Sequence, residues 1–335
     1  MKHEITEGLN EEYYQINPDI LGSFNKFRPP LNIYRFDEEV ARIIPYYKVG
    51  GRLSNEQIEE LAELTKEGVI FVSRDDHPVY VKHISYQLDL VLVDKNLKER
   101  EIGDIFTQAL ARRCKEFFEQ PVPVVFSKLW TDMMVLTEYL YNDIHRSRAL
   151  ARRLNKEYAL EIHAVNTAYI GLALFGSMRK RDFEEGGVKR KAFDRLTAGL
   201  FLHDLGMTKV PSFILQKDKP LTGDERSKVN QHPSQGYQML SKLDLKYPEV
   251  EECVLGHHER VTGNGYPQKQ SGDAMGYFGK LCGLADSFCA MTSKRPYRSE
   301  AMTADEAANK LLMDKGYDQN MTGMLRKLVT DLKLK

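Results

Sequence analysis

The sequence has little cysteine, no net charge and no long apolar run. Only four of its 335 residues are cysteine, and no two of them form a Cys-x-x-Cys pair. We therefore interpret them as reduced core thiols of a cytoplasmic protein. Lysine plus arginine equals aspartate plus glutamate, at 48 each, so nothing in the charge balance indicates duplex nucleic acid or an anionic membrane as a partner.

Hydrophobic segments are also short. No run of about 18 apolar residues occurs, so we expect no membrane span. The first ten residues, MKHEITEGLN, lack the apolar core of a secretory signal. Apolar residues make up 42% and charged residues 29% of the chain, a composition typical of a globular protein. The length is sufficient for two domains of ordinary size.

Residues 1–121 are expected to form a small α+β domain with a regulatory or dimerisation role. Ser54 followed by Gln57 is a capping box that predicts a helix over 55–66, and Gly68 ends it. The apolar segment 69–72 then has strand character. The other elements expected here are an aromatic-bearing N-terminal arm over 1–27, extended segments at 31–36 and 78–82, and helical periodicity over 84–119.

Residues 122–335 show helical periodicity throughout, so the fold class is α+β overall, with a small N-terminal α+β domain followed by an all-α bundle. Capping boxes at Thr222 and Thr303 open two of the helices, the second being the last clear one. The sequence Gly-Asn-Gly-Tyr-Pro at 263–267 predicts a tight loop. The remaining helices are predicted over 125–145, 147–180, 191–205, 234–243, 248–259 and 273–292.

The segment around His203 and Asp204 organises the chain's chemistry. An apolar run precedes this pair and Gly206 follows it, which predicts a buried helix ending in a glycine C-cap. Burying both groups without partners is costly. For an isolated pair, a histidine bonded to its neighbour at a capped helix end would be the better interpretation. Here the chain supplies five more imidazole or carboxylate groups, in apolar helical stretches or beside loops: His163, His232, His257, His258 and Asp286.

These groups are predicted to form one metal cluster. His163 alone would be interpreted as a core histidine, but His257 shares an apolar helical face with Val250 and Val254. His258 lies about 100° further round the helix, which favours two metals side by side over one. A single metal needs three or four protein ligands, whereas this chain offers seven candidates, with Asp204 as the natural bridge. They are His163, His203, Asp204, His232, His257, His258 and Asp286.

Two divalent ions about 3.5–4 Å apart lower the pKa of a bridging water and hold phosphate oxygens. A pair of metals with histidine and aspartate ligands therefore favours phosphoester hydrolysis. An oxygen-activating di-iron site is the alternative, although such sites usually contain more glutamate. Cys282 and Cys289 flank Asp286 at helical spacing. For both, packing is a better interpretation than metal ligation.

The motifs resemble the HD-GYP branch of the HD phosphohydrolase superfamily. The matching pieces are His163, HDLG at 203–206, HP at 232–233, HHER at 257–260, GNGYP at 263–267, AD at 285–286 and TSKRPYR at 292–298. The resemblance implies an HD-type helical bundle over 122–335 that hydrolyses cyclic di-GMP to pGpG, and often on to GMP. It also implies iron or manganese as the metals, and the seven residues above as their ligands. Asp204 and His203 would act with the metal-bound hydroxide, and the GYP loop would contact diguanylate cyclase domains.

Four positions depart from the family pattern. Met207 stands where family members usually have a lysine near a substrate phosphate, and Lys209 is the candidate substitute. Thr262 and Cys289 replace two aspartates of the motifs. Ala159 replaces the glutamate of three-metal members, so we predict two metals, with iron favoured over manganese.

Three further residues are predicted to bind substrate. Arg295 and Arg298 would pair with phosphate oxygens of the dinucleotide; the alternative is a solvated loop with helix-capping roles. Tyr266 would stack on guanine or dock a partner domain, and the alternative is a turn residue packed for stability. Both interpretations stay open for Tyr266.

Three hypotheses follow for the function. The favoured one is a two-metal phosphodiesterase acting on cyclic di-GMP. The second is an inactive sensor or scaffold that binds a cyclic dinucleotide and signals through its N-terminal domain or GYP loop, as Met207, Thr262 and Cys289 suggest. The third is hydrolysis of a related cyclic dinucleotide. Homodimer formation is a plausible expectation from the aromatic-rich N-terminal arm.

Overall fold

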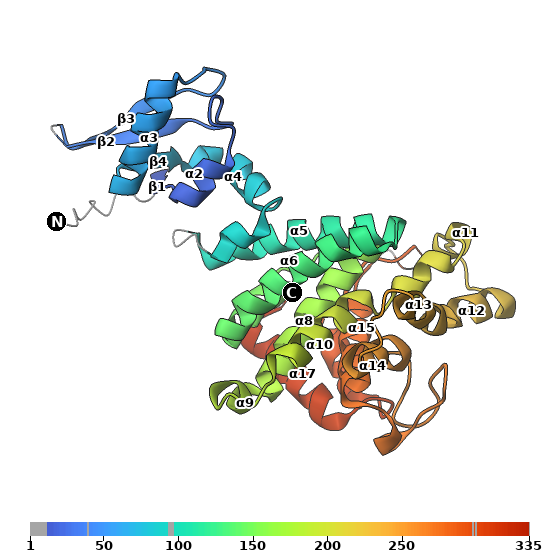
Figure 1. Cartoon of the computed structure of the whole chain (residues 1–335). Coiled ribbons are helices and arrows are strands. Elements are labelled where there is room, and N and C mark those ends of the chain that lie inside the picture. Colours follow the sequence, from blue (N-terminus) through green and yellow to red (C-terminus); the bar gives the residue numbers. More distant parts are fainter. Residues whose placement is uncertain (1–11, 39, 93–96, 297, 299, 335) are drawn as a thin grey trace. The chain divides into compact units, whose positions relative to one another are not determined.

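The computed structural model describes residues 12–38, 40–92, 97–296, 298 and 300–334. The chain divides into two compact units, residues 1–109 and 110–335 (Figure 1). Helix α5 (Glu99–Glu119) runs across this division. The predicted domain boundary at residue 121 stays a prediction.

The first unit contains a four-stranded antiparallel sheet with strand order β1-β4-β2-β3. Its centre is apolar, because Ile33, Ile70 and Val72 are fully buried. Part of the predicted N-terminal arm, Tyr13–Gln15, is the edge strand β1, in which Tyr14 pairs with Val72. The strands are β1 (Tyr13–Gln15), β2 (Ile33–Asp37), β3 (Arg42–Tyr47) and β4 (Ile70–Ser73).

Helix α3 (Asn55–Glu67) follows the prediction closely. Both hydrogen bonds of the capping box between Ser54 and Gln57 are present, and Gly68 ends the helix with φ of +82°. α3 packs on α2 and β4. The other helices of this unit are α2 (Pro18–Ser23), α4 (His77–Ile84) and the 3₁₀ turns η1 (Arg74–Asp76) and η2 (Leu88–Leu92).

The extended segment predicted at 78–82 is wrong, because this segment belongs to helix α4. Proline is well accommodated in the first turn of a helix, so Pro78 does not oppose the structure. Tyr80 and Ile84, one turn apart, are both fully buried. Tertiary burial of this face therefore outweighs the local preference of the valines for extended structure.

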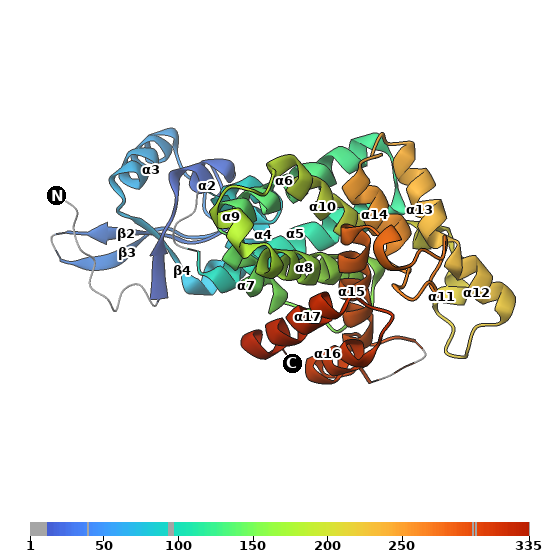
Figure 2. The ribbon, with the colours of Figure 1, turned by 90° about the horizontal axis from the view of Figure 1, so that it is seen from below.

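The second unit is built around α8 (Leu160–Met178), in which every residue from His163 to Gly176 is buried. A helix that is apolar on all sides needs neighbours on all sides. Helices α7, α10, α15 and α17 provide them. Figure 2 shows α16 and α17 side by side, next to α15. The other elements of this unit are α6 (Pro123–Asn142), η3 (Ile144–Arg146), α7 (Ser147–Ala151), α9 (Lys180–Glu184), α10 (Arg190–Leu202), η4 (Leu205–Lys209), α11 (Ser212–Leu215), α12 (Gly223–Asn230), α13 (His232–Ser241), α14 (Pro248–Gly256), η5 (Gly272–Ala274), α15 (Tyr277–Thr292), α16 (Ala304–Met313) and α17 (Gln319–Leu332).

The single long helix predicted over 147–180 is wrong in part, because α7 ends at Ala151 and α8 begins at Leu160. Asn155 explains the interruption. The side-chain oxygen of Asn155 accepts a hydrogen bond from the backbone N–H of Glu157. The backbone N–H of Asn155 donates to Asn166 Oδ1 at 3.1 Å. Asparagine side chains that bond nearby backbone compete with the helix in this way.

Among the described residues, no helix combines the length and the apolar character that crossing a bilayer requires.

Candidate metal centre

Five helices of the second unit bring the predicted ligands together. The side chains come from the first turn of α8, the end of α10, the start of α13, the end of α14 and the middle of α15. Their ligand atoms form two groups, each within 4.8 Å. The first group is Asp204, His232, His257 and His258; the second is His163, His203 and Asp286.

The turn that carries His203 and Asp204 is held by a close backbone contact. α10 ends at Leu202, and Gly206 lies inside η4 without the left-handed backbone of a glycine cap. The predicted C-cap is therefore wrong. A Cβ at Gly206 would lie 1.9 Å from the backbone oxygen of His232 and 2.7 Å from the nitrogen of Gly236. Glycine is needed here because η4 packs backbone to backbone on α13, which places Asp204 beside His232.

Asp204 connects the two ligand groups. Its Oδ1 lies 3.2 Å from His232 Nε2 and 3.6 Å from His257 Nε2. Its Oδ2 lies 3.6 Å from His163 Nε2 and 3.7 Å from His203 Nε2. One carboxylate thus turns a different oxygen to each pair of imidazoles.

Asp286 faces the cluster from the opposite helix, α15. Its Oδ1 lies 2.9 Å from His163 Nε2 and 4.0 Å from His203 Nε2, whereas its Oδ2 lies 4.0 Å from His258 Nδ1. Asp286 is 5% exposed, so both of its oxygens are directed into the protein and toward imidazoles.

Backbone carbonyls set the tautomers of three histidines. The Nδ1 atom of His203 lies 2.9 Å from the carbonyl oxygen of Leu200. The Nδ1 atom of His232 lies 2.7 Å from the carbonyl oxygen of Val229. In His257, Nδ1 lies 2.9 Å from the carbonyl of Val254. A carbonyl only accepts, so each Nδ1 carries the proton and each Nε2 presents a lone pair to the cluster.

The positions of these imidazoles suit a bound metal ion better than a buried polar cluster without a metal. The Nε2 atoms of His232 and His257 lie 3.0 Å apart, and with both protons on Nδ1 neither atom can donate to the other. The buried Nε2 of His203 has no hydrogen-bond partner among the described residues. Lone pairs that face one another in a buried site are stabilised by a shared cation.

The electrostatics of the centre favour the metal-binding forms of three of these side chains, whereas for His232 the nearby Asp204 outweighs burial and raises the pKa. Burial lowers the pKa of His203 to about 4 and that of His258 well below its usual value, so both imidazoles are neutral near pH 7. Burial alone would raise the pKa of Asp204, but the neighbouring His203 and His232 hold it well below its ordinary range. The carboxylate is therefore ionised.

The loop after α14 supports the first ligand group. The ring of Tyr266 stacks on that of His258, with centroids 4.7 Å apart and an interplanar angle of 25°. Glu259, 3% exposed, accepts the backbone N–H groups of Gln268 at 2.6 Å and Gln270 at 2.9 Å. No role was predicted for Glu259 from the sequence, although its place directly after the two histidines was a usable signal.

A cavity of about 590 Å³ includes Met207, the residue that follows the His-Asp turn, in its lining. Arg295 also lines this cavity, and its guanidinium carbon lies 4.2 Å above the ring of Tyr158. Lys209 is exposed and is not among the lining residues. The cationic lining residues are Lys217, Lys219, Arg226 and Arg295.

Arg298 lies in a different environment from Arg295. Its Nη2 donates to the carbonyls of Ala290, Met291 and Ser293 at 2.6, 2.9 and 3.0 Å. These carbonyls end α15, so this contact matches the helix-capping alternative. A substrate role for Arg298 stays a prediction.

The departures from the family pattern can also be placed. Ala159 is the N-cap of α8 and offers no side-chain ligand. Cys289 is fully buried, and burial raises the pKa of its thiol. Cys282 is buried in the same way, with its pKa well above the usual value. Neither thiol belongs to the two ligand groups.

Comparison with known proteins connects this geometry to a family. Residues 184–321 match the HD domain family. The cyclic di-GMP phosphodiesterase response regulator RpfG of Xanthomonas campestris pv. campestris (strain 8004) is 38% identical over 116 residues, which are 34% of this chain and 30% of that protein. A cyclic di-GMP phosphodiesterase of Thermotoga maritima is 34% identical over 125 residues, or 37% and 34% of the two chains.

Other similarities extend the comparison. The 3'3'-cGAMP-specific phosphodiesterase 2 of Vibrio cholerae is 29% identical over 131 residues, or 39% of this chain and 25% of that protein. The alignments thus span a quarter to a third of these curated relatives. Among solved structures, Bd1817, a HDG"Y"P protein from Bdellovibrio bacteriovorus, has a similar fold: the TM-score is 0.62 and the identity 18%, over 95% of this chain and 99% of that one.

The HD-GYP resemblance that the motifs predicted is confirmed, because residues 184–321 match the HD domain family and the chain is similar to curated cyclic di-GMP phosphodiesterases.

Proposed function

We propose that the protein is a metal-dependent phosphodiesterase that hydrolyses cyclic di-GMP to linear pGpG, GMP or both. The observation that carries this proposal is the position of Asp204, whose two oxygens face different pairs of imidazoles. A carboxylate in this position suits two neighbouring divalent ions. Such ions, when bound, supply an activated water and neutralise charge on a phosphoryl group.

The chain's own residues hold and orient this centre. His232, His257 and His258 complete one ligand group with Asp204, and His163, His203 and Asp286 form the other. Nitrogen and carboxylate donors of this kind accept iron, manganese, zinc and nickel alike, and the HD-GYP resemblance favours iron first and manganese next. The lone pairs of three imidazoles are already aimed inward by carbonyl contacts, so little reorganisation is needed on binding.

The cavity lined by Met207 and Arg295 is the proposed substrate site. Arg295 and Arg226 line it, and a guanidinium can hold two phosphate oxygens at once. Lys217 also lines it but is held by both oxygens of Glu225, at 2.7 and 2.8 Å. A volume of about 590 Å³ lies within the usual range for ligand pockets. This lining is suited to a ligand with several phosphate oxygens and apolar ring surfaces.

The named activities of the relatives support the substrate class. Two are cyclic di-GMP phosphodiesterases and one is specific for 3'3'-cGAMP. We therefore take cyclic di-GMP as the first substrate and 3'3'-cGAMP as the second to be tested. Contact of the GYP loop with diguanylate cyclase domains, homodimer formation and a cytoplasmic location stay predictions from the sequence.

The test is cyclic di-GMP turnover by protein purified without oxygen and supplied with iron or manganese, with metal content measured on the same sample. Two metals per chain and turnover that a chelator abolishes are the expected results. Asp204→Ala should abolish turnover, because it removes the carboxylate whose two oxygens face imidazoles of both groups. The matched control is Lys310→Ala, at an exposed position on α16, which should leave the rate unchanged. Full turnover by Asp204→Ala would refute the proposal.

A cyclic-dinucleotide sensor is the second candidate, and Met207 favours it. This uncharged side chain lines the same cavity as Arg295 and offers no contact to a phosphate charge. Tight binding of cyclic di-GMP without turnover, in protein shown to hold two metals, would decide for the sensor. Met207→Lys would then be the first variant to assay for restored hydrolysis.

A further inference from the structure

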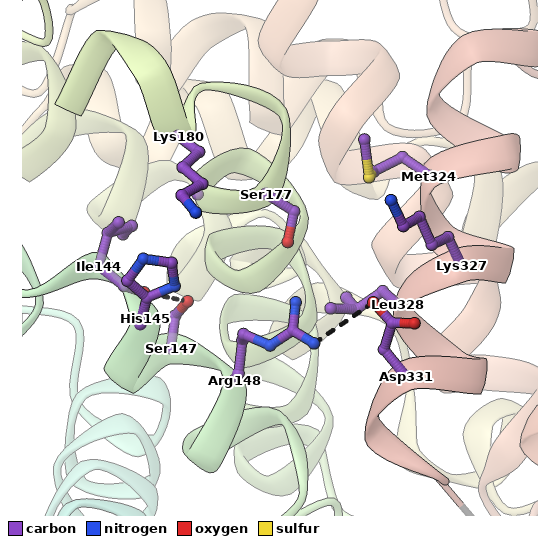
Figure 3. A pocket seen from close by; sticks show the side chains of 11 residues that line it. Ile144, His145, Ser147, Arg148, Ser177, Lys180, Met324, Lys327, Leu328 and Asp331 are labelled. Atoms are coloured by element: carbon purple, nitrogen blue, oxygen red, sulfur yellow. Dashed lines mark hydrogen bonds and ion pairs between the residues drawn. The ribbon is translucent and has the colours of Figure 1, made fainter. Parts of the chain in front are cut away.

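A second cavity in the 110–335 unit gathers basic side chains from segments far apart in the chain. Its volume is about 230 Å³. Figure 3 shows the amines of Lys180 and Lys327 and the guanidinium of Arg148 directed toward a common space, with the ring of His145 beside it. Arg148 and Lys327 are 179 positions apart in sequence, so the fold brings these charges together.

The charge around this cavity is unbalanced. Asp331 is its one lining carboxylate, and it lies 3.4 Å from Arg148 Nη2. Lys180 has only a loose pair with Glu184 at 3.7 Å, in which both side chains are more than half exposed. Lys327 has no ion pair among the described residues. Three cations therefore share a cavity with one anion, although the whole chain has no net charge.

The floor of the cavity is apolar and closely packed. Ile144 and Leu328 are buried there. A Cβ added at Gly176 would lie 2.5 Å from Ile144 Cγ1, so α8 and the η3 turn touch without a gap. An apolar wall lowers the local dielectric and strengthens the attraction of the surrounding cations for an anion.

The size of the cavity restricts the ligand. A volume of about 230 Å³ corresponds to roughly eight water molecules at the density of the liquid. This is enough for a phosphoryl group with a small organic part, and it is below the usual range for pockets that enclose larger ligands. Flexible amines and a guanidinium are common partners of phosphate oxygens.

We propose that this cavity is a binding site for a small phosphate monoester, separate from the metal centre. Gly176 and Ser177 contribute the α8 wall, and His163 lies on the same helix 13 positions before Gly176. At 1.5 Å per residue the two sites are about 20 Å apart along α8. The bound anion joins α17, α7 and α9 through Lys327, Arg148 and Lys180, respectively.

The experiment is calorimetric titration of the full chain with inorganic phosphate and with glycerol 3-phosphate, at constant ionic strength. Saturable binding to one site is expected. Lys327→Ala should weaken it about tenfold, the effect of losing one charged hydrogen bond. The matched control is Lys310→Ala, an exposed lysine on α16 outside the cavity, which should bind like the original chain.

Phosphate can also bind at a metal centre, so the titration is repeated with Asp204→Ala. Binding that survives in Asp204→Ala and is lost in Lys327→Ala supports the proposal, whether or not the protein hydrolyses a dinucleotide. Three results would overturn it: no saturable binding, equal affinity in Lys327→Ala and the original chain, or loss of binding in Asp204→Ala alone.

Discussion

Replacement of Gly206 by alanine tests how the metal centre is assembled. The added Cβ would lie 1.9 Å from the backbone oxygen of His232, whereas ordinary contacts begin near 3.4 Å. The turn after α10 and the start of α13 must therefore move apart by more than 1 Å. Overpacking usually costs about 1–3 kcal/mol, and a clash between two backbone segments belongs at the upper end of that range.

This movement should affect metal binding as well as stability. His232 Nε2 lies 3.2 Å from Asp204 Oδ1, and the two residues lie on the two segments that Gly206→Ala pushes apart. A loss of about 3 kcal/mol corresponds to a fall of roughly 6–12 °C in melting temperature for a unit of this size. We also expect fewer metal ions per chain after purification with iron or manganese.

Thermal unfolding and metal analysis of the same sample provide the assay. The matched control is Gly223→Ala, at the first residue of α12, where no atom lies within 4 Å of the added Cβ. This control should keep its metals and be unchanged or up to about 1 kcal/mol more stable. Equal melting temperatures and metal contents for the two variants would refute the packing argument at Gly206.

Four more outcomes are expected. Chelation of the metallated protein should lower its melting temperature, because ions bound to the folded state stabilise it by mass action, by about 4 kcal/mol at a thousandfold excess over Kd; an unchanged melting curve after proven metal removal would contradict this. Arg298→Ala should lower the free energy of unfolding by about 2 kcal/mol, because three carbonyls at the end of α15 lose a charged donor. Arg295→Ala should leave stability nearly unchanged and raise KM for cyclic di-GMP. A loss of stability in Arg295→Ala together with a raised KM in Arg298→Ala would mean that Arg295 is the structural arginine and Arg298 the substrate-binding one. Finally, a thiol reagent should label none of the four cysteines in the native protein and all four in denaturant, since all are buried; fast labelling of the native state would show that part of the core opens.

The structure brings the predicted ligands together, and the sequence signals that pointed to them are local and chemical, while their role as metal ligands stays a prediction. Helical spacing placed His257 on an apolar face, and the structure buries that side chain completely. The predicted bridge, Asp204, lies between two pairs of imidazoles. Histidines and aspartates in apolar stretches need partners, so their number alone indicated a shared centre.

The sequence failed where a long-range contact decides the local structure. The position of Gly206 after an apolar run suited a helix cap. In the structure, a glycine is needed there because the backbone of α13 packs directly against it, at His232, 26 residues later in the sequence. The segment around Pro78 looked extended, but burial of Tyr80 and Ile84 makes it helical. In such cases the local sequence does not show which distant segment will pack against it.

The ligands come from widely separated parts of the chain, and this has a consequence for folding kinetics. His163 and Asp286, which lie 2.9 Å apart, are separated by 123 positions in sequence. A contact between residues so far apart in sequence is expected to form late, after α8 and α15 have docked. Metal capture is therefore expected to be a late step that selects chains whose second unit is already assembled, and an emerging polypeptide that ends before α15 cannot complete the second ligand group.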